Sequence, residues 1–270
     1  MKWLSIFFLF IYTAAFSQQT HWRVEYMVLK YKTPEQKQRW DSISKSNGYN
    51  FKKISRNKEF YKSLYRQTYF LDLNKEASLY THKPKMIRMA GEYRRYFNSD
   101  EIYKNLKNNE IITTTSLFDT SYLIKDTLPV FHWKITGETK KIGRYTAIKA
   151  VGTEKIWKKK VRMPDLSGKK NIKPAVKSKM VNSEVTAWFT PEIPISNGPE
   201  KYGGLPGLIL ELHIPGKIYM AKKISINPRR KKEIKAPIEG TYITRKVLRK
   251  KRDSLELIMI KSLINHRKKE

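Results

Sequence analysis

Histidines and carboxylates are the residues of this chain best suited to proton transfer or metal binding, and their spacing decides which chemistry to expect. The five histidines are scattered, as His21, His82, His132, His213 and His266. No His-Glu-x-x-His motif and no cluster of carboxylates accompanies them, so the sequence predicts no metal centre. Glu211 and His213 would share one face of a strand, where a carboxylate can orient an imidazole. Such a pair more often lies on the solvent face of a strand, and we predict no catalytic residue.

The other reactive side chains give little support for nucleophilic catalysis. The chain has no cysteine, which excludes disulfides, thiol nucleophiles and thiolate metal sites. Ser196 lies between Ile195 and Asn197, outside any Gly-x-Ser-x-Gly motif. We therefore expect a noncatalytic protein without a cofactor, and we keep an enzyme of unknown substrate as an alternative.

Residues 203–212 combine a constrained turn with an apolar strand. Pro206 suits the second position of a type II turn, and Gly207 suits the positive φ that this turn requires at its third position. Aromatic and apolar side chains nearby are predicted to line an apolar binding mouth at the end of a sheet. The candidate binding residues are Trp188, Phe189, Tyr202, Leu205, Pro206 and Gly207. The alternative is that they only close the edge of the core.

The chain is strongly basic, with 56 Lys and Arg against 24 Asp and Glu and a formal net charge of +32. Such a surface attracts polyanions. The basic residues are unevenly distributed, because residues 155–179 hold ten of them against the single acid Asp165. The candidate anion-binding residues are Lys158, Lys159, Lys160, Arg229, Arg230, Lys231 and Lys232. The alternative is a solvated basic surface without a specific partner.

The first residues have the pattern of a secretory signal peptide. Met1 and Lys2 form a short positive head, residues 3–16 are apolar, and Ala15 and Ser17 are small residues at the positions that a signal peptidase requires. This predicts a signal peptide over residues 1–17, a mature chain from Gln18, and a periplasmic or outer-membrane-associated location. Beyond it, no stretch approaches the roughly 20 apolar residues of a membrane span, so we expect no transmembrane helix in the mature chain.

The remainder, residues 18–270, is predicted to form one β-rich domain. Alternation predicts a strand at 22–28, and Thr33 and Pro34 predict the start of a helix that ends near Gly48. Further strands are expected at 69–73, 78–80, 93–97, 111–117 and 122–125, too close together for helical crossovers. The pattern favours an antiparallel meander.

The second half continues with strands. Residues 132–135 and 142–150 predict a pair of strands, followed by 184–190 and 218–226. Between the predicted strands at 142–150 and 184–190, residues 155–182 have no sustained periodicity and are expected to form a long, mobile basic insertion. Apolar side chains at helical spacing predict an amphipathic, basic C-terminal helix within residues 244–270.

The run Gly204-Leu205-Pro206-Gly207-Leu208-Ile209 and residues 133–150 and 186–212 resemble the GLPGLI family, secreted proteins of Bacteroidetes. The resemblance implies secretion but no established activity. The order of elements is similar to that of periplasmic lipoprotein carriers, which implies an α+β, mainly β fold with a curved antiparallel sheet, an open half-barrel, an N-terminal helix and a C-terminal helix.

These observations favour a noncatalytic periplasmic or envelope-associated binding protein that holds a lipid or another apolar ligand in the concavity of its sheet. The alternative is a basic surface protein that binds anionic envelope polymers, such as lipopolysaccharide, acidic glycan or nucleic acid. The candidate partners are envelope lipid, an anionic glycan and an outer-membrane protein.

Overall fold

The computed structural model describes residues 20–31, 66–83, 85–89, 92–96, 100–117, 120–162 and 175–267. The predicted signal peptide at 1–17 and the predicted helix at 33–48 lie outside these residues. The strands of the first half are β1 (Trp22–Lys30), β2 (Arg66–Leu73), β3 (Ala77–His82), β4 (Lys85–Met89), β5 (Glu92–Tyr96), β6 (Glu101–Asn105), β7 (Glu110–Leu117) and β8 (Thr120–Thr127). The second half contains β9 (Lys134–Ile142), β10 (Tyr145–Arg162), β11 (Ala175–Thr190), β12 (Leu208–Ile214), β13 (Lys217–Ile226), β14 (Thr241–Tyr242) and helix α4 (Arg245–Arg267).

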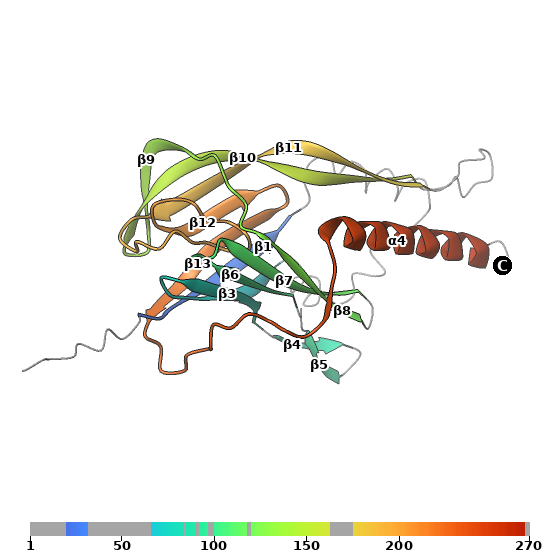
Figure 1. The fold of residues 1–270 in the computed structure, drawn as a ribbon, viewed down its shortest axis with the longest axis horizontal. Helices are drawn as coiled ribbons and strands as arrows, with labels where there is room; N and C mark the ends of the chain where they lie inside the picture. Colours follow the sequence, from blue (N-terminus) through green and yellow to red (C-terminus); the bar gives the residue numbers. More distant parts are fainter. Residues whose placement is uncertain are drawn as a thin grey trace, which may run out of the picture.

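Among the described residues, twelve strands form one open sheet in the order β14-β8-β7-β6-β3-β2-β1-β13-β12-β11-β10-β9 (Figure 1). Its ladders are antiparallel except for the short parallel pair of β14 and β8. Strands β4 and β5 pair with each other outside this sheet. The fold is therefore mainly β with an antiparallel sheet and a C-terminal helix, as the sequence predicted.

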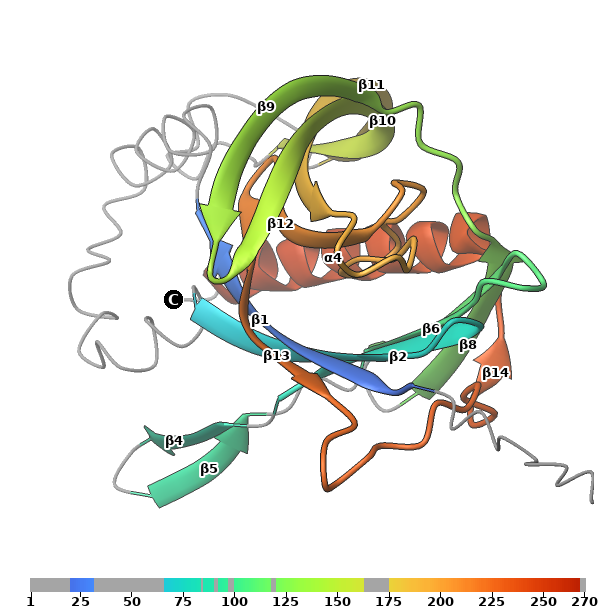
Figure 2. The same cartoon turned by 90° about the vertical axis from the view of Figure 1, so that its left-hand side faces the viewer.

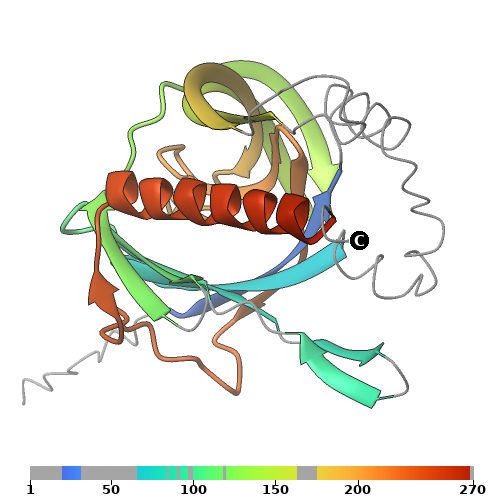
Figure 3. The same ribbon diagram turned by 90° about the vertical axis from the view of Figure 1, so that its right-hand side faces the viewer.

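The sheet must be strongly curved, because a short connection joins its opposite edges. Strands β8 and β9 are ten strand positions apart in the sheet, which a flat sheet would place roughly 48 Å apart. Only residues 128–133 connect them, and so short a segment spans at most about 25 Å. The sheet bends accordingly, and α4 lies within the curve, between its two halves (Figures 2 and 3).

The hydrophobic core lines the concave side of this sheet. In β1, Val24, Tyr26 and Val28 alternate with partly exposed residues, which is the period of a strand with one buried face. The loop between β11 and β12 turns back into the concavity, where Ile193 and Leu205 join the same core cluster (Figure 2). The loop thus fills part of the concavity that the sequence predicted to be open for a ligand.

The expected insertion at 155–182 is, in its described parts, a continuation of β10 and β11 rather than a loop. The two strands pair without interruption from Ile148 opposite Phe189 to Arg162 opposite Ala175. This segment extends beyond the rest of the sheet (Figure 1). Its outer face carries exposed lysines, so no period-2 pattern of apolar residues reveals the two strands in the sequence. We call residues 155–162 and 175–182 the hairpin arm.

The predicted turn at Pro206 is also different in detail. Gly207 has the expected positive φ, +152°. However, its backbone N–H donates to the carbonyl oxygen of Leu205 at 2.8 Å, an i to i+2 bond that closes a tighter turn than type II. The N–H of Leu208 instead bonds to the carbonyl oxygen of Ile193, because the strand pairs with the folded-back loop.

Candidate functional site

The structure does not gather the six predicted binding residues into one mouth. Phe189, Tyr202 and Leu205 are buried in the core, and Gly207 packs against the backbone of Thr190. Their burial supports the alternative that they close the core. The prediction that they bind a ligand is not tested by this placement.

The other two predicted residues lie elsewhere. The side chain of Pro206 is exposed. Trp188 is partly buried, and the Lys140 ammonium lies 4.2 Å from the centre of its ring. The same ammonium is 2.8 Å from both carboxylate oxygens of Glu211.

Glu211 and His213 do share a strand face, with His213 Nε2 2.6 Å from Glu211 Oε1. The carboxylate is also bound by Lys140, so its charge is already compensated. No nucleophilic hydroxyl is paired with the imidazole in the described structure. In this cluster, the carboxylate of Glu211 contacts both a lysine of β9 and a histidine of its own strand.

The predicted anion-binding residues fall into two separate groups. Lys158 and Lys160 are exposed on the hairpin arm, and Lys159 belongs to the same strand. Arg229, Arg230, Lys231 and Lys232 are exposed in the segment that follows β13. The groups lie far apart in all three views of the fold (Figures 1 to 3).

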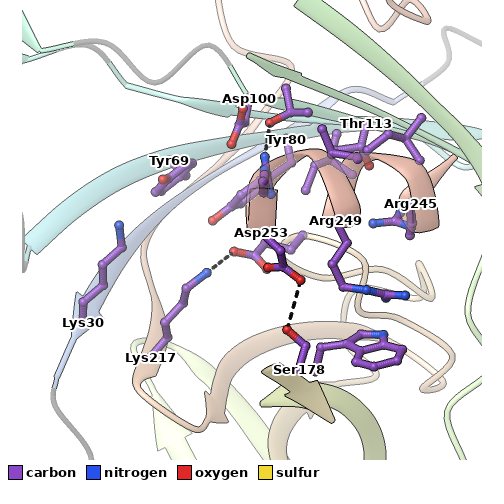
Figure 4. Close-up of a pocket in the computed structure, with 17 residues that line it drawn as sticks. Lys30, Tyr69, Tyr80, Asp100, Thr113, Ser178, Lys217, Arg245, Arg249 and Asp253 are labelled. Carbon is purple, nitrogen blue, oxygen red and sulfur yellow. Dashed lines mark hydrogen bonds and ion pairs between the residues drawn. The ribbon is translucent and has the colours of Figure 1, made fainter. Parts of the chain in front are cut away.

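A cavity of about 660 Å³ lies between α4, the hairpin arm and the concave face of the sheet (Figure 4). Its lining comes from nine strands, the segments at Asp100 and Glu200, and α4. The apolar part of the lining includes Ile102, Ile124 and Leu248, whereas five basic and three acidic side chains supply charge. The basic residues are Lys30, Lys217, Arg245, Arg249 and Arg252, and the acidic residues are Asp100, Glu200 and Asp253.

The arginines form one wall of this cavity because they repeat at helical spacing on α4. Arg245 pairs with Asp126, and the guanidinium of Arg252 donates to the hydroxyl of Thr115 at 2.8 Å. The guanidinium of Arg249 lies over the ring of Trp157, 3.6 Å from its centre. Figure 4 shows Arg245 and Arg249 on the same side of the cavity.

The opposite end is formed by two lysines that face each other across neighbouring strands. Lys30 of β1 and Lys217 of β13 are directly paired in register. Burial lowers the pKa of Lys30, and the charge of Lys217 lowers it further, while Glu200 and Asp100 oppose the shift. Glu200 accepts a hydrogen bond from Lys217 at 2.9 Å, so this end of the cavity is close to electrically neutral.

Tyrosines cover the sheet side of the cavity. The rings of Tyr69 and Tyr80 are parallel, with centres 4.9 Å apart. Tyr80 is only 2% exposed, and its hydroxyl has no hydrogen-bond partner among the described residues. Burial raises the pKa of Tyr80 well above its usual value, so this hydroxyl stays protonated and able to donate.

No local sequence pattern predicts this cavity. Its residues are scattered from Lys30 to Asp253, and only the fold brings them together. The sequence does contain one indication of it. Arg245, Arg249 and Arg252 have the spacing of residues on one face of the predicted C-terminal helix.

The described residues also show whether the protein has a metal site or a membrane-spanning helix. Within the described residues, no group of three or more His, Cys, Asp or Glu side chains is placed to hold a metal ion. None of the helical residues described forms a segment both long and apolar enough to cross a membrane.

Part of the chain is similar to a known protein family. Residues 133–211 match the model of a family described as "Protein of unknown function (Porph_ging)". The match includes the run at 204–209 on which the GLPGLI resemblance is based. The comparison with curated proteins found no match.

Two solved structures are similar to the chain, both of PNGF-II, in space groups C2 and P21. The chain is 15% and 16% identical to them, respectively, and each superposition has a TM-score of 0.46. In each case 86% of this chain is covered, but only 32% of the PNGF-II chain.

Proposed function

We propose that the protein is a noncatalytic binding protein of the cell envelope whose ligand occupies the cavity beneath α4. The observation that carries this proposal is the cavity itself, because about 660 Å³ lies within the size range of small-molecule sites. The lining contains both charged and apolar side chains, which favours a polar or amphipathic ligand. A purely apolar ligand would displace water from the arginines without replacing its hydrogen bonds, which costs free energy. The resemblance to half-barrel lipoprotein carriers is consistent with a ligand held inside a curved sheet, although here α4 and the loop before β12 share that space.

Filling the cavity should remove the ligand. Thr113 on β7 lines the cavity between Ile102 and Ile124, so Thr113→Trp would place an indole ring inside it. The measurement is native mass spectrometry of the protein isolated from its own cells, before and after denaturation in organic solvent. We expect wild type to lose a bound mass on denaturation, and we expect Thr113→Trp to be isolated without it.

The matched control is Thr120→Trp, which introduces the same ring at an exposed position of the neighbouring strand β8. This variant should retain the bound mass. A wild-type protein that shows only the polypeptide mass, or a Thr113→Trp variant that retains the ligand, would contradict the proposal. The same spectra measure the mature N-terminus, which the signal peptide predicts to be Gln18.

A second candidate function, binding of anionic polymers, is favoured by the outer face of the hairpin arm. Lys158 lies directly opposite Lys179, and Lys160 lies opposite Lys177, with all four side chains exposed. The four exposed lysines concentrate positive charge on one face of the arm, and such a surface attracts polyanions. This face is therefore a better candidate for polyanion binding than the basic residues after β13.

Salt dependence tests this second function. With single-stranded DNA as the polyanion probe, each lysine that contacts a phosphate contributes about 0.7 to the slope of log affinity against log salt. Replacing the four lysines of the arm with glutamine should therefore reduce the slope by about 3. The control removes the same charge at four exposed lysines elsewhere, Lys75, Lys107, Lys222 and Lys250. An equal loss in both variants would indicate nonspecific attraction and would exclude a site on the arm.

A further inference from the structure

Arg249 is the cavity cation with the greatest unused capacity for binding. Arg245 and Arg252, which flank it on α4, already have partners in Asp126 and Thr115. No hydrogen bond or ion pair joins the Arg249 guanidinium to another residue in the described part of the chain, where its contact is with the Trp157 ring. Stacking on an indole fixes the plane of a guanidinium but leaves its N–H groups available at the edge.

Tyr80 is a second group in the same cavity that lacks a partner. A tyrosine hydroxyl that is 2% exposed normally finds a hydrogen-bond acceptor, because burying it without one costs free energy. The Tyr80 hydroxyl has none within the described structure. The ring of Tyr80 lines the cavity, but its hydroxyl oxygen has almost no accessible surface, so Arg249 rather than Tyr80 is the group placed to bind a ligand.

The charge distribution distinguishes this wall from the lysine end. At the lysine end, Glu200 and Asp100 offset the charges of Lys30 and Lys217. The first turn of α4, by contrast, contains no acidic residue, although the amide groups at a helix N-terminus favour negative charge. Asp126 and Asp253 provide two acidic side chains against the three arginines of this wall, and an anion bound near Arg249 would offset the remaining positive charge.

We propose that Arg249 is the anion-recognition residue of the cavity, binding a carboxylate or phosphate group of a polar ligand through two N–H groups. The inference rests on the proposed function, since it assigns the ligand class and its contacts within that cavity. A planar guanidinium matches the two oxygens of either anion, which a lysine ammonium does not. A small polar body attached to that anion fits the mixed charged and apolar lining of the cavity, and an acidic sugar is one such molecule.

The test is a titration of the full-length protein by ligand-observed NMR with three probes, glucuronate, glucose 6-phosphate and glucose. Glucuronate and glucose 6-phosphate separate the carboxylate from the phosphate, and glucose reports binding without an anion. We expect at least one anionic probe to bind about tenfold more tightly than glucose. Arg249→Gln should remove this preference, and Arg249→Lys should restore only part of it.

Two further variants separate recognition from general charge and from folding. Lys250→Gln removes one positive charge from the adjacent exposed position of α4 and should leave the preference intact. Tyr80→Phe, which removes a hydroxyl group with almost no accessible surface, should leave the affinities of all three probes unchanged. Thermal unfolding of each variant establishes that the fold is retained.

The subsite is wrong if neither anionic probe binds more tightly than glucose, or if Lys250→Gln lowers affinity as much as Arg249→Gln. Failure of the subsite is distinguishable from failure of the proposed function. A ligand that copurifies with wild type and with Arg249→Gln, but not with Thr113→Trp, would keep the binding function and reject Arg249 as its anion contact.

Discussion

Gly207→Ala is expected to prevent the chain from reaching its native fold. A Cβ atom at this position would lie 2.1 Å from the carbonyl oxygen of Thr190 and 2.6 Å from its carbonyl carbon. Both are backbone atoms of β11, so no side-chain rotation relieves the overlap. The positive φ of +152° adds backbone strain for any residue with a Cβ. We expect a loss of stability of roughly 4 kcal/mol or more, measured by urea unfolding, or an insoluble product.

Gly204→Ala is the matched control because it changes a glycine of the same motif with much less overlap. Gly204 also has positive φ, +84°, but the nearest atom to its Cβ would be the Nε1 atom of Trp133 at 3.7 Å. This variant carries only the conformational cost, about 1 kcal/mol. If Gly207→Ala were no less stable than Gly204→Ala, the close approach of the loop to Thr190 would be absent in solution.

The motif shows why its sequence predicted a turn and a strand correctly but not the role of the loop. Proline and glycine restrict backbone angles locally, so Pro206 and Gly207 indicate a turn without knowledge of the fold. The distance between Gly207 and Thr190 depends on how the loop folds back, which no local pattern reports. The aromatic Tyr202 likewise suits a binding mouth or a core, and only the position of the loop inside the sheet decides that it is buried.

The strands were predictable where one face of the sheet is buried. In β1, the alternation of Val24, Tyr26 and Val28 with polar residues reflects a core on one side. The hairpin arm lacks that pattern because its outer face meets solvent and its inner face meets charged residues of α4, as the bond between Ser178 and Asp253 illustrates. The candidate cavity was less predictable still, because Lys30, Tyr80 and Arg249 become neighbours only through the curvature of the sheet.

Lys104 on β6 is a second feature that no sequence pattern identifies, since a lysine is usually exposed. It is only 1% exposed, and its Nζ atom donates to the carbonyl oxygens of Gly198 at 2.7 Å and Tyr202 at 3.1 Å. These carbonyls belong to the loop that fills the concavity, so Lys104 ties that loop to the sheet. A neutral amine has two N–H groups for these two acceptors, whereas an ammonium has a third that finds no acceptor among the described residues. Burial accordingly lowers the pKa of Lys104 to about 7, although the charge of Glu200 opposes the shift.

The stability contributed by Lys104 should therefore depend on pH in a predictable direction. In the unfolded chain its pKa is about 10.4, so between about pH 7 and that value the unfolded state binds one more proton than the folded state. Stability then rises with pH, by up to about 1.4 kcal/mol per unit, and the effect is absent at pH values well below 7. Lys104→Met retains the apolar stem but removes the titrating group.

The measurement is the difference in unfolding free energy between wild type and Lys104→Met, from urea titrations at several pH values. Both proteins contain the same other basic residues, so the contribution of those residues to the pH dependence is absent from the difference. The difference should increase in favour of wild type by about 2 kcal/mol between about pH 7 and about pH 9.

Lys107→Met is the control, because it removes an exposed lysine from the turn after β6, and its difference from wild type should not change with pH. A flat difference for Lys104→Met as well would mean that the lysine keeps its ordinary pKa, and hence that the loop does not seal it from water. The experiment thus measures how firmly the loop of residues 191–207 closes the concavity, which also determines how much of that space remains for a ligand under α4.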